Sequence, residues 1–144
     1  MRQLTITRKK SVVACLMKMR IYITDPTATD LEINGENCRK LGELKNGQTA
    51  TFRVDDRAAK VYAIADTLSR GFCNDYYPLN AGTEDVVLTG KNAFNPGAGN
   101  AFRFDGVTDE NVLANRKAGR NKGILVLIGA VIVGFLIGLL PHLL

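Results

Sequence analysis

One apolar run constrains this chain more than any other feature. The segment from Gly123 to Leu140 holds eighteen residues with neither a charge nor a hydrogen-bonding side chain. A helix needs about 20 mainly apolar residues to cross a hydrocarbon core of about 30 Å, and this run with its flanks reaches that length. A helix buried in a soluble domain would carry a polar face, and this run has none. The sequence therefore predicts a transmembrane helix over residues 123–143.

The flanks of the run predict its orientation. Four basic residues, Arg116, Lys117, Arg120 and Lys122, precede it directly, whereas Pro141–Leu144 follow it without a charge. Basic residues beside a span are retained on the cytoplasmic side. We therefore expect a tail-anchored membrane protein with a cytoplasmic N-terminal domain. The four basic residues would set the topology and contact anionic lipid.

A cleaved lipoprotein signal is the rival interpretation of the N-terminus. Val12–Cys15 fits the pattern that precedes a lipid-modified cysteine, and a basic stretch comes before it. Such a signal needs an apolar region of about 7–15 residues. Only Ser11–Ala14 separates Lys10 from Cys15. The sequence therefore does not predict a cleaved signal.

Small residues recur within the predicted span. Ala130, Gly134 and Gly138 fall four residues apart and share one helix face. Such a face lets two helix backbones approach closely, which predicts a homo-oligomer or a membrane-protein partner paired through the span. Glycine is also simply common in membrane helices, and the sequence leaves both interpretations open.

The charges are unevenly placed along the chain. Residues 1–20 carry six Lys/Arg and no acid, and residues 111–144 carry four more basic residues and no acid. The stretch between them holds all fourteen acids and nine basic residues, so its net charge is −5. A nucleic-acid surface would gather basic and aromatic side chains on one folded face. The sequence therefore predicts no nucleic-acid partner.

Residues 1–106 have the pattern of short strands separated by turns. A long alternation places one set of apolar residues on a single face: Val13, Cys15, Met17, Met19, Ile21 and Ile23. Further strands are indicated around residues 3–8, 31–35, 48–54, 60–65, 85–90 and 100–106, and Asn34-Gly35 and Asn46-Gly47 are typical of tight turns. The prediction is all-β, a small antiparallel β-sandwich. A flexible basic linker is expected over residues 107–122, before the helix.

The N-terminal half resembles a known kind of domain. The basic start at Arg8–Ser11, the long strand after it and the turn at Leu44–Gly47 are similar to small, poorly characterised bacterial β-domains of the PEGA-like type. The likeness covers residues 5–65. It implies an accessory or binding module beside a membrane span, with no catalytic residues to carry over.

Catalytic and metal chemistry are not predicted. The three cysteines, Cys15, Cys38 and Cys73, form no C-x-x-C pair, and the single histidine, His142, lies at the end of the span. A cysteine nucleophile therefore has no base on its own side of the membrane, and a zinc site lacks ligands. We expect no enzyme activity, no metal and no cofactor.

Two loops are candidates for binding. Phe72, Tyr76 and Tyr77 form either a partner patch or part of a small core, and the pattern favours the core. The glycine-rich stretch 94–102 could offer backbone N–H groups to an anion, although it lacks the features of a P-loop. The leading hypothesis is a scaffold that binds a cytosolic protein. The alternative is a small-ligand sensor, or less favoured an enzyme, that uses loops 72–79 and 94–102. A third hypothesis is peripheral binding of nucleic acid or lipid through Arg8–Lys10 and the four basic residues before the span.

Overall fold

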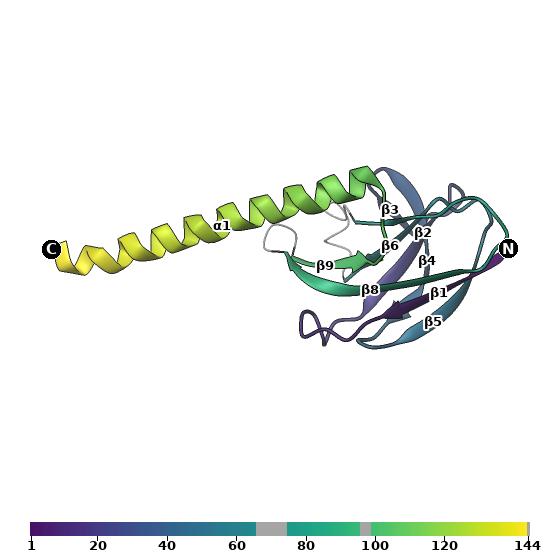
Figure 1. Ribbon diagram of the computed structural model, residues 1–144, viewed down its shortest axis with the longest axis horizontal. Coiled ribbons are helices and arrows are strands. Elements are labelled where there is room, and N and C mark those ends of the chain that lie inside the picture. The colour runs from purple at the N-terminus through teal and green to yellow at the C-terminus, as the bar shows by residue number, and fades with distance from the viewer. Residues whose placement is uncertain (66–74, 96–98, 144) are drawn as a thin grey trace.

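The computed structural model describes residues 1–65, 75–95 and 99–143, and it contains two β-sheets and one long helix (Figure 1). The first sheet has the order β5 (Thr49–Val54), β1 (Arg2–Arg8), β8 (Val86–Asn95) and β9 (Gly99–Phe104). The second has the order β3 (Leu31–Ile33), β4 (Glu36–Leu44), β2 (Met19–Thr24), β6 (Lys60–Ile64) and β7 (Tyr77–Pro78). The helix α1 runs from Glu110 to Leu143. The predicted β-rich domain followed by an apolar helix is confirmed.

The sheets share one apolar core. The first sheet contributes Leu4, Ile6, Leu88, Phe102 and Phe104, and the second contributes Met19, Ile21, Ile23, Leu44 and Val61. In the first sheet these side chains alternate with less buried ones, because successive residues of a strand point to opposite faces. In the second sheet the opposite face carries a smaller buried cluster that includes Tyr22, Tyr62 and Ile64. The predicted core faces of residues 19–23 and 50–54 are therefore found as expected.

The sheets are not wholly antiparallel as predicted. β1 pairs with β8 in parallel, with Leu4 opposite Val86 and Arg8 opposite Gly90, while the other strand pairs are antiparallel. A parallel pair needs a long crossover connection. Here the whole second sheet lies between the two strands in the sequence.

The predicted strand over residues 12–18 is wrong. β2 begins only at Met19, and residues 9–18 form a loop, named loop 9–18 below. Ala14 has a φ of 53°, which is not a strand conformation. The guanidinium of Arg8 binds the carbonyl oxygens of Ala14 at 2.7 Å and Met17 at 2.6 Å. These hydrogen bonds hold the backbone of loop 9–18 in a curved, non-extended conformation. The alternation of apolar residues in the sequence does not reveal such a conformation.

The expected flexible linker is also wrong from residue 110 onward, because α1 already begins at Glu110. Asp109 caps the helix, its carboxylate accepting from the backbone N–H groups of Asn111 at 2.9 Å and Val112 at 3.1 Å. Val112 is fully buried in the shared core. Capping and burial together make an ordered helix start where the basic, glycine-containing sequence indicated a tether.

The strand directions give the domain two distinct ends. β8 runs parallel to β1, β9 returns antiparallel to β8, and α1 then turns back. The helix therefore runs the same way as β1, as Figure 1 shows. Loop 9–18 and the turn 45–48 lie at the end from which α1 leaves, here named the proximal end. Residues 24–27, 34–36 and 55–59 lie at the opposite, distal end.

Candidate functional site

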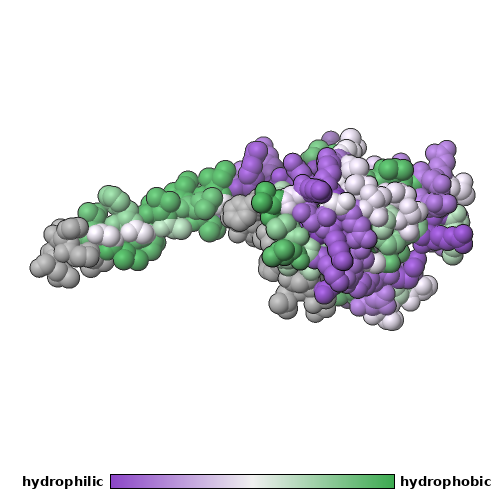
Figure 2. Space-filling model, turned by 90° about the horizontal axis from the view of Figure 1, so that it is seen from below, coloured by the Kyte–Doolittle hydropathy of each residue, from purple (hydrophilic) through white to green (hydrophobic). Residues whose placement is uncertain are grey.

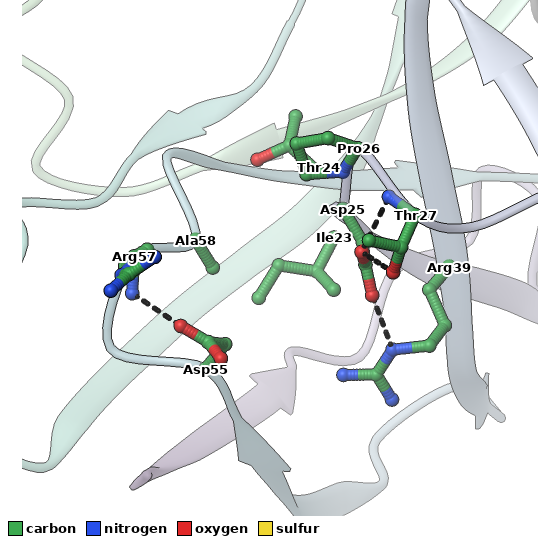
Figure 3. Close-up of a pocket in the computed structure, with 9 residues that line it drawn as sticks. All are labelled: Ile23, Thr24, Asp25, Pro26, Thr27, Arg39, Asp55, Arg57 and Ala58. Carbon is green, nitrogen blue, oxygen red and sulfur yellow. Dashed lines mark hydrogen bonds and ion pairs between the residues drawn. The ribbon is translucent and has the colours of Figure 1, made fainter.

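The distal end carries a hollow between two short loops, lined by both apolar and charged residues. It has a volume of about 340 Å³ and a neighbouring hollow has about 390 Å³. The two share the same rim residues: Thr24, Asp25, Pro26 and Arg57. In Figure 3 the loop after β2 lies on one side and the turn after β5 on the other, with Ile23 and Ala58 between them.

Asp25 organises the first side of the hollow. One carboxylate oxygen accepts from the backbone N–H of Thr27 at 3.0 Å and from its hydroxyl at 2.7 Å. The other accepts from the Nε of Arg39 at 3.1 Å. The hydroxyl of Thr27 is the main reason that the pKa of Asp25 lies below its usual value, with Arg39 adding to it. The carboxylate is therefore charged and already occupied.

A tight turn forms the second side. The carboxylate of Asp55 accepts from the backbone N–H of Arg57 at 2.8 Å, and the N–H of Ala58 donates to the Asp55 carbonyl at 3.2 Å. Ala58 is buried beneath the turn. The exposed Arg57 side chain lines both hollows and forms no ion pair with any residue that the structure describes. Arg57 is thus the cation available to a ligand.

A partly exposed polar cluster around Glu36 supports the neighbouring hollow. The carboxylate of Glu36 accepts from the ammonium of Lys60 at 2.8 Å and from the hydroxyl of Tyr62 at 2.8 Å. Burial would raise the pKa of Glu36, but the bonds from Lys60 and Tyr62 outweigh it and lower the pKa. Lys60 also lies over the ring of Tyr76, 5.0 Å from its centroid. This cluster fixes the strands behind the hollow.

The charged side chains decide which chemical groups the hollow could bind. In the described part of the chain no three His, Cys, Asp or Glu side chains lie together as a metal site would require. The charged groups at the hollow are two carboxylates, Asp25 and Asp55, both held by hydrogen bonds, the paired Arg39 and the open Arg57. A guanidinium offers several N–H donors in a planar fork. Such a site suits a carboxylate or carbonyl group on a partner.

The predicted aromatic patch is divided by the structure. Tyr76 and Tyr77 are half-buried against the core, where Tyr76 lies 5.8 Å from the Tyr62 ring and Tyr77 lies 6.1 Å from Phe104. Phe72 lies outside the described residues. Tyr76 and Tyr77 thus contact the core, as the interpretation of these aromatic residues as core residues requires. A partner-binding patch at these residues stays a prediction.

The glycine-rich stretch 94–102 belongs to the β8–β9 hairpin. β8 ends at Asn95 and β9 begins at Gly99, and residues 96–98 lie outside the described residues. An anion site in this stretch stays a prediction.

The four basic residues before the span differ in their burial and in their contacts. Arg116 is half-buried and binds the carboxylate of Asp75, with Nη2 to Oδ1 at 2.9 Å, and the carbonyl oxygen of Phe104 at 2.8 Å. Its hydrogen bond to Asp75 raises its pKa. Lys117, Arg120 and Lys122 are exposed on α1. Lipid contact therefore stays a prediction for those three, while Arg116 fastens the helix to the domain.

The described side chains of the predicted span are exposed. One helix in the described chain is long and apolar enough to cross a membrane, and its apolar side chains are exposed along the segment, as the green surface in Figure 2 shows. Ala130, Gly134 and Gly138 are exposed, and nothing lies within 4 Å of a Cβ atom built on either glycine. Pairing of helices through this face stays a prediction.

Sequence reasoning missed the residues of the distal hollow. Asp25, Arg39 and Arg57 lie apart in the chain and meet only because the ends of β2 and β5 lie beside the start of β4. One local signal was present, since Asp-Pro-Thr at residues 25–27 is typical of a turn in which aspartate binds its own backbone. It predicts a fixed loop and gives no indication of a ligand.

Comparison with protein-family models, with curated proteins and with solved structures found no match for this chain. The resemblance to PEGA-like β-domains therefore stays a prediction, and the function has to be argued from the geometry of the chain itself.

Proposed function

We propose that this protein is a membrane-anchored, non-catalytic binding module. Its α1 helix crosses the membrane once, and its β-domain faces the cytoplasm and binds a protein partner with the distal end. One observation carries the proposal: α1 begins at Glu110, buries Val112 in the core and continues unbroken into the apolar segment. A domain joined in this way is held at the membrane in a fixed orientation. Its distal hollow then points away from the lipid.

The distal hollow supports a binding role. Arg57 is exposed, has no ion-pair partner among the described residues, and sits on a turn that Asp55 holds in place. Arginine is enriched at the centre of protein interfaces, where its fork of donors gives both affinity and specificity. Attachment to a membrane also raises the effective concentration of the module near its membrane neighbours.

A topology experiment tests the anchor. Ala81, exposed near the distal end, is changed to Cys in the full chain with Cys15→Ser and Cys73→Ser; Cys38 is retained because it is buried. We expect a membrane-impermeant thiol reagent to label Ala81→Cys only after cell lysis. The matched variant His142→Cys should label in intact cells. Labelling of Ala81→Cys in intact cells would refute the cytoplasmic placement.

A second experiment tests the binding face. A photoreactive residue replaces Thr27 at the hollow, and in a matched variant it replaces Val87, which is exposed on the outer face of the first sheet. We expect a discrete cross-linked protein at Thr27 that is lost when Arg57→Ala is added, and none at Val87. Equal cross-linking at both positions, or no effect of Arg57→Ala, would contradict binding through the hollow.

A small-ligand sensor is the second candidate. The hollow of about 340 Å³ has the size of a small-molecule site. It is lined by residues of the β2 and β5 ends, which differ from the predicted loops 72–79 and 94–102. A bound metabolite carrying a carboxylate should raise the melting temperature of the full chain in detergent. That shift should vanish in Arg57→Ala, whereas a shift that persists would place the ligand elsewhere.

A further inference from the structure

Loop 9–18 at the proximal end exposes an apolar tip. Val12 and Leu16 are 93% and 96% exposed, and Cys15 and Met17 are exposed beside them. Large apolar side chains that are exposed together on one loop indicate a contact surface. In Figure 2 apolar surface is visible at the end of the domain next to the helix.

The loop is rigid at its base. The buried guanidinium of Arg8 donates to the carbonyl oxygens of Ala14, Met17 and Leu44 and to the side chain of Asn92. Ser11 is fixed separately. Its N–H donates to the side chain of Asn46 at 3.0 Å, the amide of Asn46 donates back to the Ser11 carbonyl at 3.0 Å, and its hydroxyl donates to the Asn92 carbonyl. The apolar tip is therefore presented by a fixed support.

The position of loop 9–18 along the axis of α1 can be estimated from the register of the paired strands. Arg8 lies opposite Gly90, Gly90 lies opposite Phe104, and Arg116 binds the Phe104 carbonyl. The loop thus leaves the domain near the level of Arg116 and projects in the direction in which the helix runs. At about 1.5 Å per residue, Arg116 is only about 10 Å from Gly123, where the apolar run begins. The tip therefore reaches the level of the exposed basic residues of α1, where lipid headgroups would lie.

The charges of the domain agree with this orientation. The proximal end carries basic side chains: Lys9, Lys10, Lys18 and Lys45. Lys10 and Lys45 form no ion pair with any described residue, while Lys9 pairs with Asp105 and Lys18 with Glu43. The distal end carries most of the acids, among them Asp25, Glu36 and Asp56, which form ion pairs, and Asp55, Glu84 and Asp85, which form none with a described residue. A membrane surface with anionic lipid attracts the first end and repels the second.

We propose that loop 9–18 is a second membrane contact, in which Val12 and Leu16 enter the interface of an anionic lipid surface and the neighbouring lysines bind its headgroups. This inference rests on the proposed anchoring by α1. Apolar side chains ringed by lysine are what an interfacial membrane contact requires, because the apolar atoms leave water while the ammonium groups meet phosphate. The contact would fix the tilt of the domain as well as its height.

Spin labelling in vesicles tests the proposal. The full chain with Cys73→Ser is labelled with a nitroxide at Cys15, since Cys38 is buried, and is reconstituted into phosphatidylcholine with phosphatidylglycerol. Collision with oxygen is compared with collision with a water-soluble nickel chelate. We expect oxygen to dominate at Cys15 and the chelate to dominate at a distal Thr27→Cys label in a Cys15→Ser background. In pure phosphatidylcholine, or with Lys10→Glu and Lys45→Glu, the Cys15 label should shift toward the chelate.

A label at Val131→Cys separates this inference from the anchoring that it assumes. Oxygen dominance at Val131→Cys with chelate dominance at Cys15 would overturn the loop contact and leave the anchor standing. Chelate dominance at both positions would overturn both. Spin–spin broadening at Cys15 that disappears on dilution with unlabelled protein would identify a second copy of the chain as the occupant, and would equally overturn the lipid contact.

Discussion

Arg8 is the residue on which the proximal end depends. Its side chain is fully buried, has hydrogen bonds to four groups and meets no carboxylate among its described partners. Burial lowers its pKa, yet a guanidinium stays charged in proteins. A buried charge is tolerated only when its donors are satisfied, and here backbone carbonyl oxygens satisfy most of them. The charge thus determines the path of the backbone around it.

Replacing this side chain should be costly. We expect Arg8→Met to lower the free energy of unfolding by about 3 kcal/mol, because three carbonyl oxygens and the Asn92 amide oxygen lose their donors. The measurement is denaturant unfolding of the full chain in detergent, with hydrogen exchange to follow residues 14–17. Arg53→Met, on the exposed face of β5, is the matched control and should change stability by less than about 0.5 kcal/mol. An equal effect of both variants would argue against this role.

The buried thiol of Cys38 predicts how the stability of the folded protein depends on pH. It is buried beneath the second sheet, and burial, followed by the charge of Glu36, raises the pKa of its thiol to about 11. A thiol in the unfolded chain ionises at about 9, so between those values the folded state binds more protons and stability falls as the pH rises. We expect stability to decline more steeply above pH 9 in the parent chain than in Cys38→Val. Parallel pH profiles would contradict it.

The same residue differs from Cys15 in reactivity. Cys15 is exposed and Cys38 is buried. At neutral pH a thiol reagent should therefore modify Cys15 rapidly and Cys38 only after unfolding, since the thiolate is the reactive form and access is required. Peptide mapping by mass spectrometry gives the answer. Rapid modification of Cys38 in the folded protein would show that the strand packing is more open than described.

At the scale of elements, the start of α1 decides how the domain and the helix are joined. Val112 fills the core, and Arg116 clamps Asp75 and the Phe104 carbonyl one turn later. We expect Val112→Ala to cost about 2 kcal/mol of folding free energy and to speed hydrogen exchange over residues 110–116. Leu113→Ala, the exposed neighbour, is the matched control. Unchanged exchange in Val112→Ala would mean that the helix start is held elsewhere.

The elements also show what the sequence could and could not predict. The span is evident from composition alone, and β5 follows from alternation because one of its faces is more buried than the other. β2 and β6 are indicated by their β-branched and aromatic residues, although both faces of β6 are buried. The curl of loop 9–18 depends on Asn46 and Asn92, which are distant in the chain. The helix start depends in the same way on Asp75, and the distal hollow on three separate strand ends. Local patterns carry no signal for such long-range contacts.

At the scale of the whole molecule, the proposals combine into a module with fixed polarity. In the proposed arrangement the basic proximal end and the exposed Lys117, Arg120 and Lys122 lie toward the lipid, and the distal end with Arg57 at its hollow lies away from it. Because the helix start is rigid, the length of α1 between the domain and the apolar segment fixes the distance between the domain and the lipid. A flexible tether would leave that distance undefined.

This fixed distance is open to a direct test. Inserting Glu-Ala-Ala-Lys between Gly119 and Arg120 adds no net charge and lengthens the helix by about 6 Å at about 1.5 Å per residue. We expect the nitroxide at Cys15 to change from oxygen-dominated to chelate-dominated collision, because the tip is lifted from the lipid interface. A label at Val131→Cys should stay oxygen-dominated, since the span remains inserted. If Cys15 keeps its oxygen-dominated collision in the lengthened chain, the helix does not set the height of the domain. The rigid junction at Val112 and Arg116 would then have to yield in the membrane.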